Sequence, residues 1–190
     1  SLFGIVQGGE YEDLRRHCVE ELVKMDFDGY SIGGTSVGED KPTQYKMVRY
    51  ATKYLPEDKV RYLMGVGDPI DIVENVCNGI DIFDCVSPTR LARHGHALTR
   101  YGKINIKNAK YKSDFTPIEK GCTCYACQNY TKAYVKHLIN CEETFGARLL
   151  SIHNIHYLIN LTEELRTAIK NDNLLAYREE FIKNYYGENK

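Results

Sequence analysis

Short apolar runs alternate with longer amphipathic segments over the first half of the chain. The apolar runs predict four strands, at Leu2–Val6, Gly29–Gly34, Val60–Val66 and Ile80–Val86. Between them, apolar residues recur three and four positions apart, which predicts helices over Glu10–Met25, Pro42–Tyr54 and Pro69–Cys77. Strands that alternate with helices are typical of a parallel sheet with helical crossovers. The first half of the chain is therefore predicted to be α/β.

The predicted strands end in polar or glycine-rich turns. These turns are Gln7-Gly8-Gly9, Gly33-Gly34-Thr35, Gly65-Val66-Gly67 and Asp84-Cys85. In doubly wound sheets and in (β/α)8 barrels, active sites form at the carboxyl ends of the strands. A complete barrel needs eight β/α units and about 250 residues. The four units over residues 1–87 therefore predict half a barrel or a small open sheet.

The pattern changes after Pro88. Short alternating runs from Ala97 to Ile106, around Tyr101-Gly102, predict a β-hairpin. Helical spacing then returns over residues 130–140, 154–171 and 174–185. Residues 88–190 are therefore expected to form a second part, with a hairpin, a cysteine-rich loop and a helical tail.

The composition fits a globular chain with a real core. Hydrophobic residues make up 43% and charged residues 27% of the 190 residues, which excludes a disordered or collagen-like protein. No run approaches the roughly 18 apolar residues of a membrane span, and the sequence shows no secretion signal. We therefore expect a cytoplasmic protein with no membrane partner. Because the sequence begins Ser-Leu-Phe-Gly-Ile-Val without an initiator Met, we also expect a fragment of a longer protein.

Basic residues are concentrated just after the predicted sheet. The segment from Pro88 to Ser113 contains no Asp or Glu and carries seven basic residues: Arg90, Arg93, Arg100, Lys103, Lys107, Lys110 and Lys112. The whole chain has a net charge of −1, so the remainder is acidic. A basic block in an acidic chain is a candidate phosphate-contacting surface. A solvated face without a ligand is the alternative.

Three of the seven cysteines crowd into Cys122-x-Cys124-x2-Cys127. Without a secretion signal, metal binding is favoured over disulfide bonds. A tetrahedral structural zinc (Zn2+) site needs a fourth ligand, and the available candidates are His137, Cys141, His153 and His156. We favour His153, because we expect it at the start of a helix, where its ring can turn back toward the preceding loop; His156 is the second choice. Four protein ligands would make the zinc structural.

Two acids interrupt the fourth predicted strand. We expect Asp81 and Asp84 on the same face of this strand, with Asp84 at its carboxyl end, just before Pro88-Thr89-Arg90. An acid at a cleft beside phosphate-binding side chains suits covalent or acid–base chemistry on a nucleotide. The alternative is an acid that caps a helix or pairs with Arg90.

Several groups of residues occur together, and in this order, in one known family. They are Phe3-Gly4-Ile5-Val6-Gln7-Gly8-Gly9, Ile32-Gly33-Gly34-x-x-Val37-Gly38-Glu39, Tyr62-Leu63-Met64-Gly65-Val66-Gly67, Gly79-Ile80-Asp81-x-Phe83-Asp84-Cys85-Val86, Pro88-Thr89-Arg90-x2-Arg93-x-Gly95, and the set Cys122, Cys124, Cys127 and His153. From Phe3 almost to the C-terminus, the chain closely resembles the bacterial type of tRNA-guanine transglycosylase. The resemblance implies the C-terminal half of a (β/α)8 TIM barrel with a zinc-binding subdomain and a helical tail.

The resemblance also implies roles for individual residues. Asp84 matches the nucleophile that attacks C1′ of the wobble-position guanosine, forming a covalent aspartyl–ribosyl intermediate that a 7-deazaguanine base (preQ1 or queuine) then displaces. Gln7 and the Gly34 backbone match the groups that hydrogen-bond the purine edge, and Met64 matches the apolar wall that stacks on the base. Arg90 and Arg93 match the tRNA-contacting arginines, and the resemblance implies the zinc ligands Cys122, Cys124, Cys127 and His153. The resemblance further implies a homodimer of the full-length enzyme.

Two departures from the family pattern bear on the base. Thr35 and Ser87 stand where bacterial members usually carry aliphatic residues, and both are expected near the base pocket. The family's general acid/base aspartate lies in the other half of the barrel, so the fragment alone is expected to be inactive. The alternatives are a zinc-stabilised, non-catalytic tRNA-binding subunit of a transglycosylase, or a generic phosphate-binding half-barrel.

Overall fold

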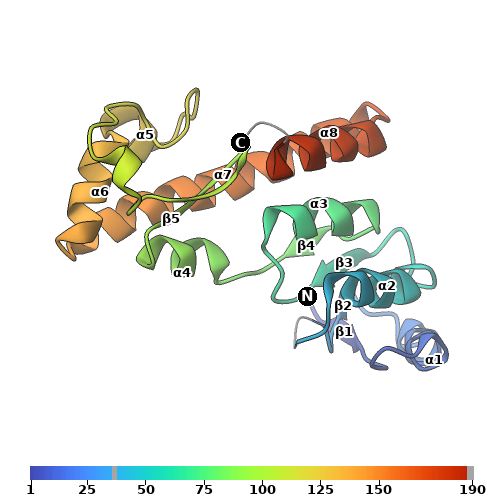
Figure 1. The fold of residues 1–190 in the computed structure, drawn as a ribbon. Coiled ribbons are helices and arrows are strands. Elements are labelled where there is room, and N and C mark those ends of the chain that lie inside the picture. The colour runs from blue at the N-terminus through green and yellow to red at the C-terminus, as the bar shows by residue number, and fades with distance from the viewer. Residues whose placement is uncertain (36–37, 188–190) are drawn as a thin grey trace. The chain divides into compact units, whose positions relative to one another are not determined.

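A computed structural model describes residues 1–35 and 38–187 of the chain. Contacts between residues divide the chain after Cys85 into two units, which we term the first unit (residues 1–85) and the second unit (from residue 86 on). Figure 1 follows their elements along the chain. Among the described residues, no helix combines the length and the apolar character that crossing a bilayer requires.

The first unit is a four-stranded parallel sheet whose strands are joined by helices. Its elements, in chain order, are β1 (Phe3–Val6), α1 (Glu12–Val23), β2 (Gly29–Ile32), α2 (Lys41–Thr52), β3 (Val60–Leu63), α3 (Pro69–Cys77) and β4 (Ile82–Phe83). The strand order in space is β1-β2-β3-β4, and each neighbouring pair is parallel. The sheet thus grows in one direction, one β/α unit at a time.

Alternation along the strands separates a core face from a second face. Val6, Ile32 and Leu63 are fully buried, together with Val19 of α1 and Val48 of α2, so the helices cover this face. Each such burial contributes about 1.5–3 kcal/mol. The second face stays more open, because Ile5 and Ile82 remain 45% and 44% exposed. Polar chemistry can therefore be placed on that face without disrupting the core.

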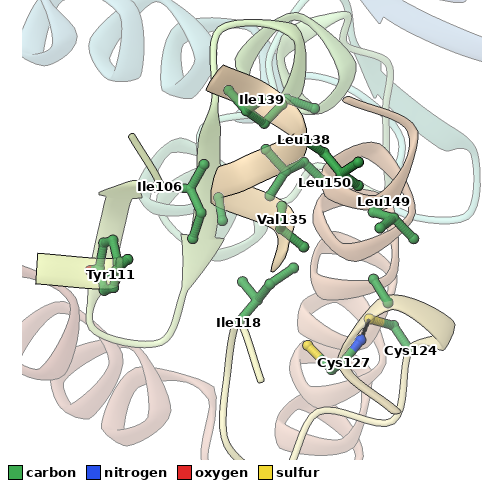
Figure 2. Packing of buried hydrophobic residues seen from close by; sticks show 13 residues of the cluster. Ile106, Tyr111, Ile118, Cys124, Cys127, Val135, Leu138, Ile139, Leu149 and Leu150 are labelled. Carbon is green, nitrogen blue, oxygen red and sulfur yellow. Dashed lines mark hydrogen bonds between the residues drawn. The ribbon is translucent and has the colours of Figure 1, made fainter. Parts of the chain in front are cut away.

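The second unit combines a hairpin with a helical bundle. Its elements are α4 (Ser87–Arg93), β5 (His96–Thr99), β6 (Gly102–Asn105), the 3-10 turn η1 (Ala109–Tyr111), α5 (Tyr125–Asn129), α6 (Lys132–Asn140), α7 (Thr144–Lys170) and α8 (Leu174–Tyr186). β5 and β6 form an antiparallel pair. Figure 2 shows its core, in which Ile106 and Ile118 pack with Val135 of α6 and with Leu149 and Leu150 of α7.

Several predicted boundaries were wrong. The fourth strand is two residues long instead of seven, and α4 was not predicted at all. The long helix of the tail begins at Thr144, ten residues earlier than the sequence pattern indicated. The hairpin, by contrast, was placed correctly, since β5 and β6 lie within the predicted Ala97–Ile106 segment apart from His96.

Candidate active site and metal centre

The register of the sheet aligns the residues that follow each strand. Val6, Ile32, Leu63 and Phe83 are neighbours in one row across the four strands, and each is the last residue of its strand. The residues next in sequence are Gln7, Gly33, Met64 and Asp84. Because successive side chains alternate between faces, these four belong to the open face and not to the core face. Parallel strands in this register therefore bring Gln7, Met64 and Asp84 to one edge.

A cavity of about 470 Å³ lies at this edge. The residues that line it are Ile5, Gln7, Ile32, Gly33, Gly34, Thr35, Tyr62, Met64, Gly65 and Asp84. The structure thus brings together the four residues that the resemblance assigned to catalysis and base binding. Gly34 turns the chain with φ +63°, a conformation that side-chain-bearing residues rarely adopt. Apolar walls with a few convergent polar groups are typical of a small-molecule site.

The Asp84 carboxylate is held by two donors. Its Oδ1 atom accepts hydrogen bonds from the Tyr62 hydroxyl at 2.6 Å and from the Gly65 backbone N–H at 2.9 Å. The hydrogen bond from Tyr62, followed by that from Gly65, holds the pKa of Asp84 below its ordinary value. Asp84 is therefore an exposed, ionised carboxylate at neutral pH that lines the cavity, with Oδ1 held by both hydrogen bonds.

Asp81 does not share the face of Asp84, so that prediction was wrong. Residues three positions apart point to opposite sides of a strand. The Asp81 carboxylate accepts from the backbone N–H of Arg61 at 2.8 Å, and the Asp81 N–H donates to the Arg61 carbonyl at 2.9 Å. Asp81 therefore extends the pairing of β3 with the chain before β4, which is a structural role.

Thr35 and Ser87 lie in different surroundings. Thr35 lines the cavity, is 7% exposed, and has no hydrogen-bond partner for its hydroxyl within the described part of the chain. Ser87 is the first residue of α4 in the second unit, whereas all residues that line the cavity belong to the first. Of the two departures, only Thr35 contributes to the wall of this cavity.

Cys122, Cys124, Cys127 and His153 come together in the second unit. Their ligand atoms all lie within 4.8 Å of one another, and the three sulfurs are 3.4–3.7 Å from Nδ1 of His153. A tetrahedral zinc ion with ordinary Zn–S and Zn–N bonds separates sulfur from nitrogen by about 3.6 Å. A hydrogen bond from Cys127 lowers the pKa of the Cys124 thiol to about 3, with His153 adding to the effect against burial. This group can bind a metal ion.

The other ring nitrogen of His153 is also accounted for. Nε2 lies 2.8 Å from the Leu98 carbonyl of β5, and a ring that donates its Nε2 proton to this carbonyl offers Nδ1 to a metal ion on the side of the sulfurs. The neighbouring Asn154 bonds the Leu98 N–H and the Pro88 and His96 carbonyls, and both residues are fully buried. His153 lies with the three cysteines as predicted, but the reason given for it was wrong, because it lies in the third turn of α7 and not at a helix start.

The remaining candidate ligands lie elsewhere. Cys141 and His137 contact each other at the end of α6, with Sγ 3.8 Å from Nδ1. His156 binds the Thr123 hydroxyl and the Asn160 amide through Nε2. Neither histidine is part of the four-residue metal group that the structure describes.

The basic residues after Pro88 do not form one uniform surface. Arg90 and Arg93 are exposed on α4. Arg100 instead pairs with Glu164 of α7, and the Lys110 ammonium lies over the Tyr111 ring at 5.2 Å. Arg90 and Arg93 are thus available to a ligand, whereas Arg100 is partly engaged in holding the hairpin to α7.

Two contributors to these sites were not assigned roles from the sequence. Tyr62 holds Asp84, and it stands two residues before Met64 on the same strand, so strand alternation could have indicated that it shares the open face. The Leu98 carbonyl orients His153, but a backbone group leaves no trace in the sequence.

Comparisons with known proteins agree with this geometry. The family model described as queuine tRNA-ribosyltransferase matches residues 1–187. The queuine tRNA-ribosyltransferase of Macrococcus caseolyticus is 57% identical over 97% of this chain, and those of Staphylococcus haemolyticus and Staphylococcus aureus are 55% identical over the same share. The chain covers 49% of each of these relatives, about half their length. The chain belongs to the queuine tRNA-ribosyltransferase family.

Proposed function

We propose that this chain is the nucleophile-carrying, C-terminal half of a tRNA-guanine transglycosylase. The complete enzyme would replace guanine at the wobble position of the anticodon with a 7-deazaguanine base, preQ1 or queuine. The observation that carries the proposal is an ionised, doubly hydrogen-bonded Asp84 at a cavity lined by Gln7, Gly34 and Met64. Family membership supports the same reaction.

The first unit is proposed to be half of a (β/α)8 barrel. Its strand order runs in one direction without the reversal that a doubly wound sheet contains. Crossovers between parallel strands are right-handed in nearly all proteins, so strands added in one direction place their helices on one face, as in a barrel. Residues 1–87 would then supply four β/α units, and residues 88–190 the tRNA-contacting hairpin, zinc-binding subdomain and helical tail.

The proposed chemistry begins at Asp84. Oδ2 attacks C1′ of the wobble nucleoside while the bond from C1′ to N9 of guanine breaks, and the electron pair of that bond leaves with the base. The hydrogen bonds from Tyr62 and Gly65 hold Oδ1 in place, so the carboxylate presents Oδ2 without losing entropy in the transition state. The product of this step is an aspartyl–ribosyl ester.

The second step reverses the first with a new base. N9 of the incoming 7-deazaguanine gives its proton to the general acid/base of the other half and forms a bond to C1′, while the C1′–O bond breaks and the Asp84 oxygen leaves as a carboxylate. Two inversions at C1′ retain the glycosidic configuration, as in retaining glycosidases. A carboxylate suits both steps, because it is nucleophilic enough to trap an oxocarbenium-like centre and stable enough to leave again.

The cavity walls are proposed to select the base. Met64 offers an apolar surface, 38% exposed, against which a purine can stack. Gln7 carries both a donor and an acceptor for a purine edge. Arg90 and Arg93 on α4 would bind the tRNA backbone, since guanidinium groups suit phosphate recognition.

The metal group is proposed to hold a structural zinc ion. Its three sulfurs and one imidazole nitrogen are the donor set that zinc prefers, and they leave no position for substrate. When bound, zinc would cross-link the loop from Cys122 to Cys127 to α7. It would thereby stabilise the unit that carries Arg90 and Arg93.

The chain by itself is proposed to be nearly inactive. It spans about half the length of its relatives, and the resemblance assigns the general acid/base to the other half. Removing an acid/base group typically costs 10²–10⁴-fold in rate, roughly. We further propose that the full-length enzyme is a homodimer in the cytoplasm. Sedimentation equilibrium of that enzyme tests the oligomeric state.

Incorporation of radiolabelled guanine into tRNA tests the proposal in a full-length enzyme that contains this chain. Asp84→Asn should abolish incorporation, while the matched Asp81→Asn variant should retain it to within about tenfold. A non-catalytic tRNA-binding subunit would instead bind tRNA without incorporating guanine, and neither substitution would matter. That outcome would replace the proposed function with the alternative one.

A further inference from the structure

Arg15 of α1 is a buried charge whose hydrogen bonds go to backbone carbonyls, while the Glu39 carboxylate acts on it through Coulombic attraction. Its side chain is fully buried, and within the described residues its hydrogen bonds go to three backbone carbonyls. Nε donates to the Gly9 carbonyl at 2.6 Å. Nη1 and Nη2 each donate to the Gly33 carbonyl at 3.3 Å, and Nη2 also reaches the Gly34 carbonyl at 3.5 Å.

Burying a guanidinium at this position costs desolvation free energy that an apolar side chain would not cost. Burial lowers the pKa of Arg15 from its ordinary value, which records how much water the group has lost. An apolar side chain of similar volume often stabilises a fold at least as well as a buried charge. Helix packing alone therefore does not account for an arginine here.

The carbonyls that Arg15 binds belong to the two loops that build the cavity. Gly9 follows Gln7 in the loop after β1, and Gly33 and Gly34 form the loop after β2. Gly33 and Gly34 line the cavity, whereas Arg15 does not, so the guanidinium lies behind the loops. The packing is close, since a Cβ on Gly8 would lie 2.6 Å from the Arg15 backbone nitrogen and 2.8 Å from its Cγ.

The direction of a carbonyl fixes the direction of the adjoining N–H. In a trans peptide the C=O and N–H bonds point to opposite sides, and the described chain contains no cis peptide bond. With the Gly33 carbonyl turned toward Arg15, the N–H of Gly34 points away from Arg15. Both glycines line the cavity, so this N–H is the backbone donor that the loop can offer to a bound base.

We propose that Arg15 is a positioning residue that holds the Gly33–Gly34 peptide with the Gly34 N–H toward the cavity, as a donor to the 6-carbonyl oxygen of a guanine-type base. The inference rests on the proposed function. Only arginine offers donors in a planar fork that can hold carbonyls of two loops at once. A lysine ammonium carries a charge of the same sign but cannot reproduce that fork.

Three purine bases distinguish a positioning role of Arg15 from a role in supporting the loop structurally. Guanine carries the 6-carbonyl and the 2-amino group, hypoxanthine keeps only the carbonyl, and 2-aminopurine keeps only the amino group. Inhibition constants of hypoxanthine and 2-aminopurine are measured against incorporation of labelled guanine by a full-length enzyme. The variants are Arg15→Lys and, as a second variant that keeps the length of the side chain without any donor, Arg15→Met. Arg16→Lys is the matched control, because Arg16 is the exposed neighbour on the same helix, paired with Glu20.

We expect the wild-type and Arg16→Lys enzymes to favour hypoxanthine over 2-aminopurine. In Arg15→Lys and Arg15→Met this preference should fall about 5–10-fold, the loss expected for one hydrogen bond, and KM for guanine should rise more than kcat falls. Equal losses for both bases, or an unchanged preference in an Arg15 variant that melts like the wild type, would overturn the inference and leave the proposed function intact. A wild-type enzyme that incorporates no guanine would overturn both.

Discussion

Replacing Cys124 by serine should release the metal and unfold the second unit. Cys124 is 3% exposed, and Figure 2 shows it with Cys127 at one end of the core cluster that includes Val135 and Leu149. A serine hydroxyl stays protonated at neutral pH and is a poor zinc ligand. One of four ligands would be lost, and with it the cross-link between the loop and α7.

The expected loss of stability follows from comparing the folding free energy that a zinc site supplies with the total stability of a domain. Structural zinc sites supply roughly 10–16 kcal/mol of folding free energy at neutral pH, whereas a whole domain is stable by only about 5–15 kcal/mol. A loss of even half the zinc contribution would therefore unfold the unit at room temperature. If the cysteines were core residues alone, the same substitution would cost only about 1–3 kcal/mol, the penalty for a buried polar group.

The assay combines metal content with amide hydrogen exchange. Wild-type protein purified without chelators should contain one zinc per chain, and Cys124→Ser well under half. Exchange should accelerate throughout residues 86–187 in the variant and in chelator-treated wild type, but not in Cys141→Ser, the same change at an exposed cysteine outside the group. A Cys124→Ser protein that kept its zinc and its protection would refute the reasoning.

Three further predictions concern the active site and the tRNA surface. The hydrogen bond from Tyr62 depresses the pKa of Asp84, so we expect activity to be retained above that pKa and lost as the pH falls through it. Tyr62→Phe should raise the pKa of Asp84 and move the acidic limb of kcat/KM to higher pH, a modest effect because Asp84 is exposed. A limb that stays in place in Tyr62→Phe would count against this assignment. Arg90→Ala and Arg93→Ala should each weaken tRNA binding and reduce the slope of log K against log salt by about one, with KM for guanine unchanged, and an unaltered slope in both variants would exclude phosphate contacts. Thr35→Leu should disfavour queuine relative to preQ1 by about 10-fold, because the larger side chain takes space from the cavity. Ser87→Leu should leave this preference unchanged, because Ser87 does not line the cavity. The same ratio of queuine to preQ1 use in both variants would exclude a role for Thr35.

The sheet and the row of residues that follows its strands could be predicted from the sequence because the strands are short and uniformly spaced. Each apolar run is followed at once by Gln7, Gly33, Met64 or Asp84, and parallel strands in register bring such residues together. The fourth strand was overestimated for a local reason. Its apolar pattern continues, but at its two ends the backbone N–H groups of Arg61 and Gly65 donate to the side chains of Asp81 and Asp84 and not to carbonyls of this strand.

The second unit was harder to predict, because tertiary packing overrides the local pattern. Gly146 lies inside α7, before the helix that the pattern predicted over 154–171, and a Cβ there would come within 2.9 Å of the Leu138 Cβ on α6. Close approach of the two helices requires glycine there. The change of pattern at Pro88 gave no sign of α4, in whose first turn this proline lies and is tolerated.

Mapping the covalent bond between enzyme and tRNA tests the central claim most directly. A full-length enzyme that contains this chain is incubated with tRNA without added base, denatured and digested, and the peptides that carry a ribosyl adduct are sequenced by mass spectrometry. The adduct should lie on Asp84, be absent from Asp84→Asn and persist in Asp81→Asn. An adduct on another residue, or one that survives in Asp84→Asn, would contradict the assignment of Asp84 as the nucleophile.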